Sequence, residues 1–345
     1  MGIQSLKYKH GKQIFKTYIN VILFRIPAFL ICLISFLPVK LLAQPAPAED
    51  ENIPFLVTFG KDSDKSWGDD DFCQVFFCMI PKNHFEPVYI RVFDPGTGGD
   101  LDEMKGEFNT KINFSVYGGK YCWSDKDAQG VDPVGNYRSG INLASKTFGN
   151  EPEFDNSWYT FGPFNPFEGE LVEKFGGRLI KIIAEGVSGD DGNLYTYFLS
   201  TSPETNKEVE GGNIFTYEYT FRLYNDVKQI SQIYPYIDDK TISVKISNFD
   251  WDDDGEIRII SVAKNGIKCD VSGEDNWIVR EFPIIEEEKN TSIEIQFIKN
   301  QKSLVKNNNV CVTVLNQYGA TLPFYVIPIG GVPVYNPKIR MIGVD

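Results

Sequence analysis

The sequence predicts an all-β protein made of two β-sandwich domains of the jelly-roll or immunoglobulin-like type. Three observations predict this fold class. Aromatic residues form 14% of the 345 residues, with 26 Phe and 17 Tyr, and this composition favours strands. Short runs alternate between apolar and polar residues, and Gly, Asp, Asn or Pro separates most of them. Short strands at such spacing are typical of antiparallel sandwiches rather than of βαβ units.

The alternating runs define the strands that we expect. They lie at 55–59, 75–80, 88–93, 112–117, 178–184, 194–200, 214–223, 241–247, 256–262, 292–298, 309–315 and 323–328. The run 214–223 alternates most regularly, with Phe215, Tyr217, Tyr219 and Phe221 expected on one face of a single strand.

About 300 residues is a generous length for one sandwich, so we expect two domains. The first covers 52–224 and contains a long Gly-, Asn- and Pro-rich loop at 118–167. The second covers 228–331, with the boundary near 223–228, and a tail follows at 332–345.

Residues 1–43 resemble a secretory signal peptide. They contain no acid, six bases and the apolar run IPAFLICLISFL. Cleavage after Ala43 would leave a Pro- and Ala-rich linker at 44–54, and cleavage at Ala46-Pro-Ala48 is an alternative. A second alternative is an uncleaved membrane anchor, but Arg25 makes the continuous apolar run short for a span. We therefore expect an exported mature chain without a membrane span.

Charge limits the partners of such a mature chain. Without the six bases of residues 1–43, the 34 Lys and Arg fall to 28 against 47 Asp and Glu, which leaves a net charge of −19. A surface this acidic repels nucleic acid and anionic lipid and attracts cations.

Acidic, glycine-bearing loops are the candidate metal sites. Calcium prefers several carboxylate and carbonyl oxygens, and Gly allows the chain to turn tightly around the ion. Three such loops end strands of the first domain, at 61–71, 93–103 and 188–193, and folding is expected to bring them to one edge of the sandwich. Their candidate ligands are Asp69, Asp70, Asp71, Asp94, Asp100, Asp102, Asp190 and Asp191.

A fourth acidic loop, NFDWDDDGE, begins like an EF-hand. Asp250, Asp252 and Asp254 occupy alternate positions before Gly255. However, Ser261 takes the place of the twelfth-position Glu, and a strand pattern replaces the exit helix. The loop is predicted to be an acidic hairpin turn, with a calcium loop as the alternative.

Nucleophilic catalysis has little support in the sequence. The mature chain has one histidine, His84, and its five cysteines lie in unremarkable contexts without the ligand spacing of a zinc site. A carbohydrate-active hydrolase that uses two carboxylates stays an alternative, because the chain is rich in acids.

An aromatic stretch is the candidate ligand site. WYTFGPFNPFEG (158–169) mixes aromatic residues with Gly and Pro, as an exposed recognition loop does, although core packing is the alternative. The candidate ligand-binding residues are Trp158, Tyr159, Phe161 and Phe164.

Two resemblances accompany these observations. At FDPGTGGDLDE, INFSVYGG and SGDDGNLYTYFLS the first domain is loosely similar to accessory domains of the bacterial pre-peptidase C-terminal type. SWGDDD, YIRVFDP, WYTFGPFNP and LPFYVIPIGGVP make the mature chain resemble uncharacterised exported two-domain β-sandwich proteins of Bacteroidota-type bacteria. The resemblance implies export to the periplasm, the outer membrane or the exterior, and it implies no active-site residues.

Together, these observations predict an exported, non-catalytic binding or structural protein of the cell envelope, stabilised by calcium. Its expected partner is a glycan or an envelope protein. The alternatives are the hydrolase and an adhesin or surface-assembly component that grips its partner through 118–167.

Overall fold

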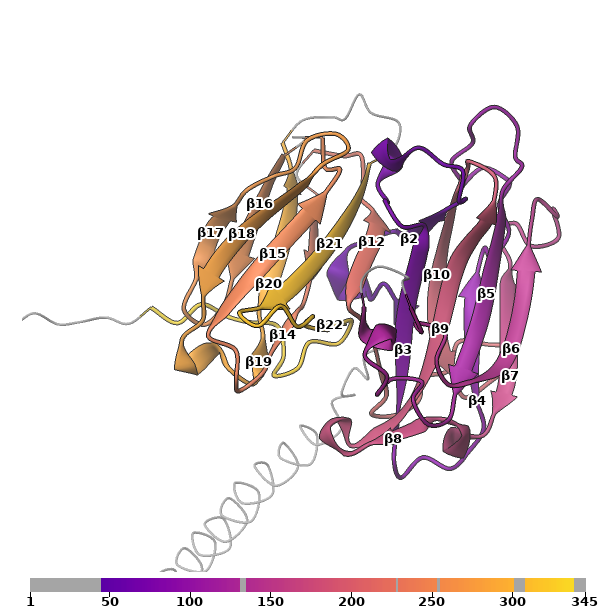
Figure 1. Ribbon diagram of the computed structural model, residues 1–345, viewed down its shortest axis with the longest axis horizontal. Helices are drawn as coiled ribbons and strands as arrows, with labels where there is room; N and C mark the ends of the chain where they lie inside the picture. The colour runs from indigo at the N-terminus through magenta and orange to yellow at the C-terminus, as the bar shows by residue number, and fades with distance from the viewer. Residues whose placement is uncertain (1–44, 131–134, 228, 253–254, 301–307, 338–345) are drawn as a thin grey trace, which may run out of the picture. The chain divides into compact units, whose positions relative to one another are not determined.

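The computed structural model of the protein describes residues 45–130, 135–227, 229–252, 255–300 and 308–337 (Figure 1). All of them belong to one compact unit, 43–345. Their helices are three-residue 3-10 turns: η1 (Glu49–Glu51), η2 (Lys65–Trp67), η3 (Asp127–Gln129), η4 (Pro166–Glu168), η5 (Glu173–Phe175) and η6 (Glu286–Glu288). No helix in these ranges is long and apolar enough to cross a membrane. The prediction of an all-β fold is confirmed.

The largest sheet has nine strands. In spatial order they are β18 (Trp277–Pro283), β15 (Ser243–Phe249), β21 (Asn309–Asn316), β12 (Glu218–Arg222), β2 (Phe55–Phe59), β10 (Gly192–Ser200), β4 (Val88–Phe93) and β7 (Trp158–Phe164), with β1 (Pro45–Ala46) paired to β10. Every pairing is antiparallel.

Three smaller sheets complete the fold. The seven-stranded sheet contains β22 (Phe324–Tyr325), β11 (Asn213–Thr216), β3 (Cys73–Pro81), β9 (Gly177–Ser188), β5 (Lys111–Gly118) and β6 (Ile141–Phe148), with β8 (Glu170–Val172) paired to β9. The four-stranded sheet contains β13 (Ile230–Ile233), β20 (Glu294–Lys299), β16 (Gly255–Ile260) and β17 (Asn265–Cys269). The last sheet pairs β14 (Tyr236–Ile237) with β19 (Thr291–Ser292).

The seven- and four-stranded sheets pack on the same face of the nine-stranded sheet. On β12, Tyr219 and Phe221 point to one side, because they are two residues apart. The ring of Tyr219 meets Phe76 of β3 at 5.7 Å, and the ring of Phe221 meets Phe297 of β20 at 5.5 Å. The chain therefore forms two sandwiches that share one sheet and one continuous core. The boundary expected near 223–228 separates neither of them, because the shared sheet and the core each contain residues from before and after it.

The run 214–223 is two strands and not one. It bends at Tyr217, so that β11 joins the seven-stranded sheet and β12 joins the nine-stranded sheet. Phe215 and Tyr217 consequently pack in a small separate cluster, whereas Tyr219 and Phe221 belong to the main core. The period of two persists across the bend, which is why the sequence alone does not reveal it.

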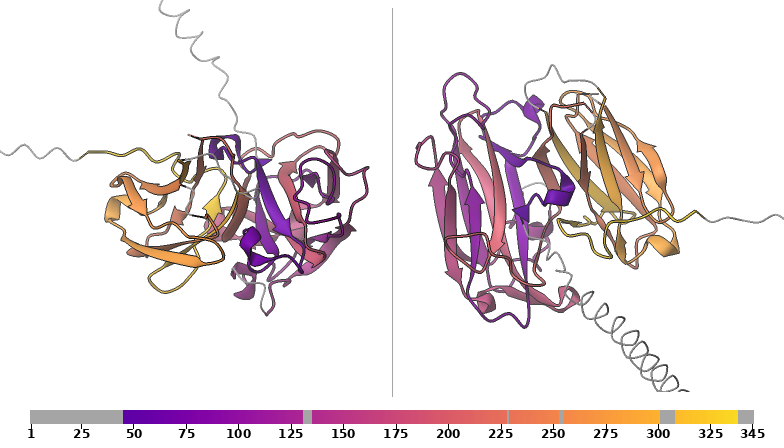
Figure 2. Two further views of the ribbon diagram at one scale, coloured as in Figure 1. Left: turned by 90° about the horizontal axis from the view of Figure 1, so that it is seen from above. Right: turned by 180° about the vertical axis from the view of Figure 1, so that it is seen from behind.

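Two further expectations change in the structure. The loop expected at 118–167 contains β6 and β7, which pair with β5 and β4. Of the linker expected at 44–54, the described residues 45–54 are part of the fold, because β1 pairs with β10 and Glu51 is fully buried. In both views of Figure 2 the indigo strands, which come first in the chain, lie between the magenta and the orange strands, in agreement with the central place of β2.

Candidate functional site

The three acidic loops of 61–71, 93–103 and 188–193 meet around the turn between β9 and β10. The backbone N–H of Asp62 donates to the carbonyl of Gly189 at 2.9 Å, and the N–H of Gly189 donates to Asp62 Oδ2 at 3.0 Å. Glu103 and Gly192 exchange two backbone hydrogen bonds of 2.9 Å. The loops are thus joined by contacts of the chain itself.

Within this region the Asp191 carboxyl group holds a segment of backbone through hydrogen bonds. It accepts backbone hydrogen bonds from Lys105, Asn109 and Thr110 at 2.8, 2.8 and 3.2 Å. Its neighbour Asp190 accepts a hydrogen bond from the Asn109 amide at 3.1 Å. Three N–H donors satisfy the buried carboxyl oxygens of Asp191, so its contacts fix the 105–110 segment.

Asp102 and Asp94 hold backbone in the same way. Asp102 accepts from the N–H groups of Gly98 and Leu194 at 2.7 and 2.6 Å, and Asp94 accepts from that of Asn156 at 2.9 Å. Burial raises the pKa of Asp94 to about 6 and that of Asp102 well above its usual value.

Other candidate ligands lie apart from Asp191, Asp102 and Asp94. Asp100 is exposed. Asp250 accepts a hydrogen bond from the Asp275 N–H at 2.7 Å, and burial raises its pKa to about 7. Asp252 adopts a left-handed conformation with φ of 54°, and Asp254 lies outside the described residues. Across the described residues, no group of three or more His, Cys, Asp or Glu side chains is arranged to hold a metal ion, and calcium binding stays a prediction.

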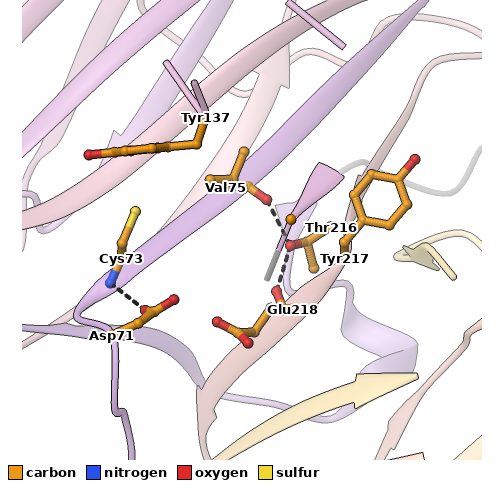
Figure 3. Close-up of a pocket in the computed structure, with 8 residues that line it drawn as sticks. Asp71, Cys73, Val75, Tyr137, Thr216, Tyr217 and Glu218 are labelled. Carbon is orange, nitrogen blue, oxygen red and sulfur yellow. Dashed lines mark hydrogen bonds between the residues drawn. The ribbon is translucent and has the colours of Figure 1, made fainter. Parts of the chain in front are cut away.

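Asp69, Asp70 and Asp71 have a different environment at the entrance to β3. Asp70 accepts a hydrogen bond from the Trp277 indole at 2.8 Å. Asp71 faces Glu218, the first residue of β12, across a small pocket, and Figure 3 shows the two carboxyl groups pointing toward each other. We call this the acid pocket; its lining residues are Asp71, Cys73, Val75, Gly130, Tyr137, Thr216, Tyr217 and Glu218.

The electrostatics of the acid pocket are dominated by burial and by like charges. Burial raises the pKa of Asp71 well above its usual value, and the neighbouring carboxyl groups of Glu218 and Asp69 raise it further. Burial also raises the pKa of Asp69 to about 7. The Asp71 carboxyl accepts a hydrogen bond from Cys73 N at 2.9 Å.

The strand switch at Tyr217 explains why Glu218 was not predicted as a site residue. In a single strand at 214–223, Glu218 would be one of several outward polar residues. The bend instead places it beside the 69–71 loop, and the Thr216 hydroxyl lies 2.7 Å from Val75 O and 2.5 Å from Glu218 O at the bend.

The aromatic stretch expected to bind a ligand faces mainly inward. Phe161 and Phe164 are each 4% exposed and lie in the main core. Tyr159 is half-buried and its ring packs against Phe161 at 4.9 Å. Trp158 is half-buried on the other face of β7, with the Arg91 guanidinium 4.8 Å from its ring. These four residues form no common exposed platform.

The thiols of the described chain are free and buried. Burial raises the pKa of Cys78 and Cys122 to about 12 and that of Cys269 to about 11. It raises the pKa values of Cys73 and Cys311 well above the usual value as well. Thiols held in the protonated form are poor nucleophiles and poor zinc ligands.

A larger concavity lies where η5, β14 and β22 come together, and the sequence did not indicate it. We call it the tyrosine groove; its lining residues are Met79, Gln129, Lys174, Phe175, Tyr217, Tyr236, Asp238, Asp239, Lys240, Asn290, Asn316, Ala320, Thr321, Leu322, Pro323, Tyr325 and Ile329. Aromatic rings form one part of its surface, with Tyr236 and Tyr325 edge to face at 6.0 Å. These residues come from segments far apart in the sequence, so no local pattern marks the groove.

Hydrogen bonds fix the polar side of the tyrosine groove. Asp238 accepts from Lys240 N at 3.1 Å and from the Thr241 hydroxyl at 2.6 Å, which holds the turn after β14 in one conformation. The Tyr236 hydroxyl donates to the Asn290 amide oxygen at 3.4 Å. Donors and acceptors therefore stand beside the aromatic rings in a largely preformed site.

Comparisons with known proteins add little to this picture. No family model matches the chain, and no curated protein matches it. Among solved structures, that of the Macrobrachium rosenbergii nodavirus aligns with 77% of this chain and 88% of its own, at 8% identity and a TM-score of 0.16.

Proposed function

We propose that this protein is an exported, non-catalytic carbohydrate-binding protein of the cell envelope, stabilised by calcium, with the tyrosine groove as its ligand site. The observation that carries the proposal is the chemistry of the groove. Sugar rings offer apolar C–H faces that pack on aromatic rings, and hydroxyl groups that need both donors and acceptors. Tyr236 and Tyr325 provide the aromatic rings, and Asp239, Asn290 and Asn316 provide the donors and acceptors.

The size of the groove also favours this site over the acid pocket. The groove has a cavity volume of about 510 Å³, whereas that of the acid pocket is about 10 Å³. An oligosaccharide needs the larger volume.

The geometry of the acid pocket favours a binding protein over a hydrolase. A glycosidase needs a glycosidic bond between its two carboxyl groups, which stand roughly 5 Å or more apart. Asp71 and Glu218 line a cavity of only about 10 Å³, so no sugar fits between them. We therefore propose a binding protein rather than the hydrolase.

An oligosaccharide array tests the proposal with the mature chain. We expect binding to at least one glycan class, with Kd measured by calorimetry. Tyr236→Ala removes a groove ring and should weaken binding at least about tenfold, which corresponds to about 1.4 kcal/mol. Trp158→Ala is the matched control, because Trp158 lies outside the groove, and it should leave Kd unchanged.

Three results would contradict the proposal. The array could yield no ligand, or Trp158→Ala could abolish binding while Tyr236→Ala does not. New reducing ends in the bound oligosaccharide would favour the hydrolase instead.

A further inference from the structure

The tyrosine groove contains charges of both signs, but its acids and its lysines are engaged differently. Lys174 and Lys240 line it together with Asp238 and the exposed Asp239. Asp238 is committed to the turn after β14, because its Oδ1 accepts hydrogen bonds from Lys240 N and from the Thr241 hydroxyl. Neither lysine ammonium forms an ion pair with a carboxylate of the described residues. Both cations are therefore able to meet an anionic ligand.

Lys174 of η5 is held over two aromatic rings. Its ammonium lies 4.5 Å from the centroid of the Trp123 ring and 4.7 Å from that of Phe175. These two rings meet edge to face at 5.2 Å, so they form one support for the ammonium. Contact with aromatic faces positions the side chain but does not neutralise its charge. Because Lys174 is also exposed, a ligand from solvent can reach this cation.

The uncharged polar groups of the groove also offer donors. The Trp123 indole donates to the Tyr217 hydroxyl at 2.9 Å, and since an indole N–H only donates, the hydroxyl keeps its own hydrogen for another acceptor. Asn316 Oδ1 accepts from the backbone N–H groups of Tyr318 and Ala320 at 2.9 and 3.1 Å, which leaves its Nδ2 without a partner in the described chain. Tyr217 is 4% exposed and Asn316 is 6% exposed, and both line the groove. Donors this deeply placed favour a ligand that is rich in acceptors.

We infer that the ligand of the tyrosine groove is an acidic glycan, in which the carboxylate of a uronic acid pairs with the Lys174 ammonium while a sugar face packs on Tyr236 or Tyr325. A carboxylate brings both the negative charge and the acceptor oxygens that these donors lack. A neutral sugar would leave Lys174 without a counter-charge. The whole chain has 47 Asp and Glu against 34 Lys and Arg, whereas the groove has two of each, so it is locally better suited to an anion than the average surface.

This inference rests on the proposed function and names the class of glycan. The two can fail separately, because a neutral oligosaccharide bound in the groove would support the proposed function and contradict the inference. If neither neutral nor acidic glycans bind, both are wrong.

The test measures binding of the mature chain by calorimetry at pH 7.5 to matched pairs of oligosaccharides. Each pair is an acidic oligosaccharide and its methyl ester, which keeps the sugar rings but removes the charge. The acidic probes are oligogalacturonate, oligomannuronate and hyaluronan oligosaccharides. We expect at least one of them to bind at least about tenfold more tightly than its ester, and this preference should shrink at high salt, where the charges are screened.

Variants locate the contact with the carboxylate. Lys174→Met keeps the apolar stem over the rings, so it should weaken binding of the acidic probe at least about tenfold and change that of the ester less than about twofold. Lys174→Arg keeps the charge and should retain most of the preference. Lys120→Met is the matched control, because the Lys120 ammonium also lies over a ring, 4.6 Å from the centroid of Tyr121, but outside the groove.

Two results would contradict the inference. No acidic probe could bind more tightly than its ester, or Lys174→Met could bind the acidic probe as well as Lys120→Met does.

Discussion

The carboxyl groups of Glu288 and Asp71 meet opposite electrostatic conditions in the same protein. Glu288 is fully buried, and the ammonium of Lys264 lies 2.6 and 2.7 Å from its two oxygens. Asp71 is half-buried, and its neighbours are the carboxyl groups of Glu218 and Asp69. Burial alone therefore does not decide how an acid is stabilised; what matters is whether the chain itself supplies the counter-charge.

The loop acids form a third case between these two. Asp191 has no ammonium group beside it in any described contact, yet three backbone N–H groups surround its carboxylate. Backbone donors hold an anion almost as well as a side-chain cation does, and they are fixed by the fold. Acids that looked alike in the sequence thus divide into those with a partner built into the chain and those that need a proton or an ion.

The largest effect is expected where a built-in partner is removed. Lys264→Met leaves the Glu288 charge buried without its cation, and we expect the free energy of unfolding to fall by about 3–5 kcal/mol. Urea unfolding followed by tryptophan fluorescence measures this loss. Lys289→Met is the matched control, because its partner Glu286 is 84% exposed, and it should cost less than about 1 kcal/mol.

A double variant separates charge from packing at this pair. Adding Glu288→Gln to Lys264→Met removes the uncompensated charge and should restore part of the lost stability. If the single variant unfolds like the wild type, the ion pair is not what stabilises Glu288.

The next effect concerns the backbone donors. Asp191→Ala leaves the N–H groups of Lys105, Asn109 and Thr110 without their acceptor, and we expect a loss of about 2–4 kcal/mol in the free energy of unfolding. The loss should be the same with calcium and with EDTA, because these contacts need no ion. Asp190→Ala, which loses one hydrogen bond to a side chain, serves as the control and should cost under about 1 kcal/mol. A loss seen only in calcium would make Asp191 a metal ligand instead.

The sequence predicted the strands well where alternation and turn residues coincide. The expected 55–59 and 88–93 match β2 and β4 in full. It did not predict β6, whose residues are mostly exposed and alternate weakly, or the bend at Tyr217, where the period of two continues from one sheet into another. Periodicity reports which residues share a face, but it does not report which sheet that face belongs to.

The candidate sites were predictable only in part, for the same reason. The acidic loops were recognisable from their composition, and their meeting around the β9–β10 turn was expected from strand ends. Whether an acid would find backbone N–H groups, as Asp191 does, or other acids, as Asp71 does, depends on contacts between segments far apart in the chain. The tyrosine groove depends on such contacts entirely, because η5, β14 and β22 each contribute only a few of its residues.

The last effect is a pH dependence at Glu51, whose carboxyl group is buried like that of Glu288 but has no cation beside it in any described contact. Its carboxyl accepts hydrogen bonds from Ala48 N at 2.7 Å and from the Tyr219 hydroxyl at 3.0 Å, but burial raises its pKa to about 8. Between about pH 4.5 and 8 the folded protein keeps a proton that the unfolded chain has lost. The free energy of unfolding should therefore decrease as the pH rises, by at most about 1.4 kcal/mol per pH unit for this proton.

Urea unfolding at pH 5, 6, 7 and 8 in EDTA measures that slope, and Glu51→Gln isolates it. The amide cannot ionise, so the variant should lose less stability than the wild type between pH 5 and pH 8. Glu49→Gln is the control in the same 3-10 turn, where the side chain is exposed, and its slope should equal that of the wild type. Equal slopes for Glu51→Gln and the wild type would mean that the two hydrogen bonds keep Glu51 ionised, and Glu51 would then belong with the acids whose partners the chain supplies.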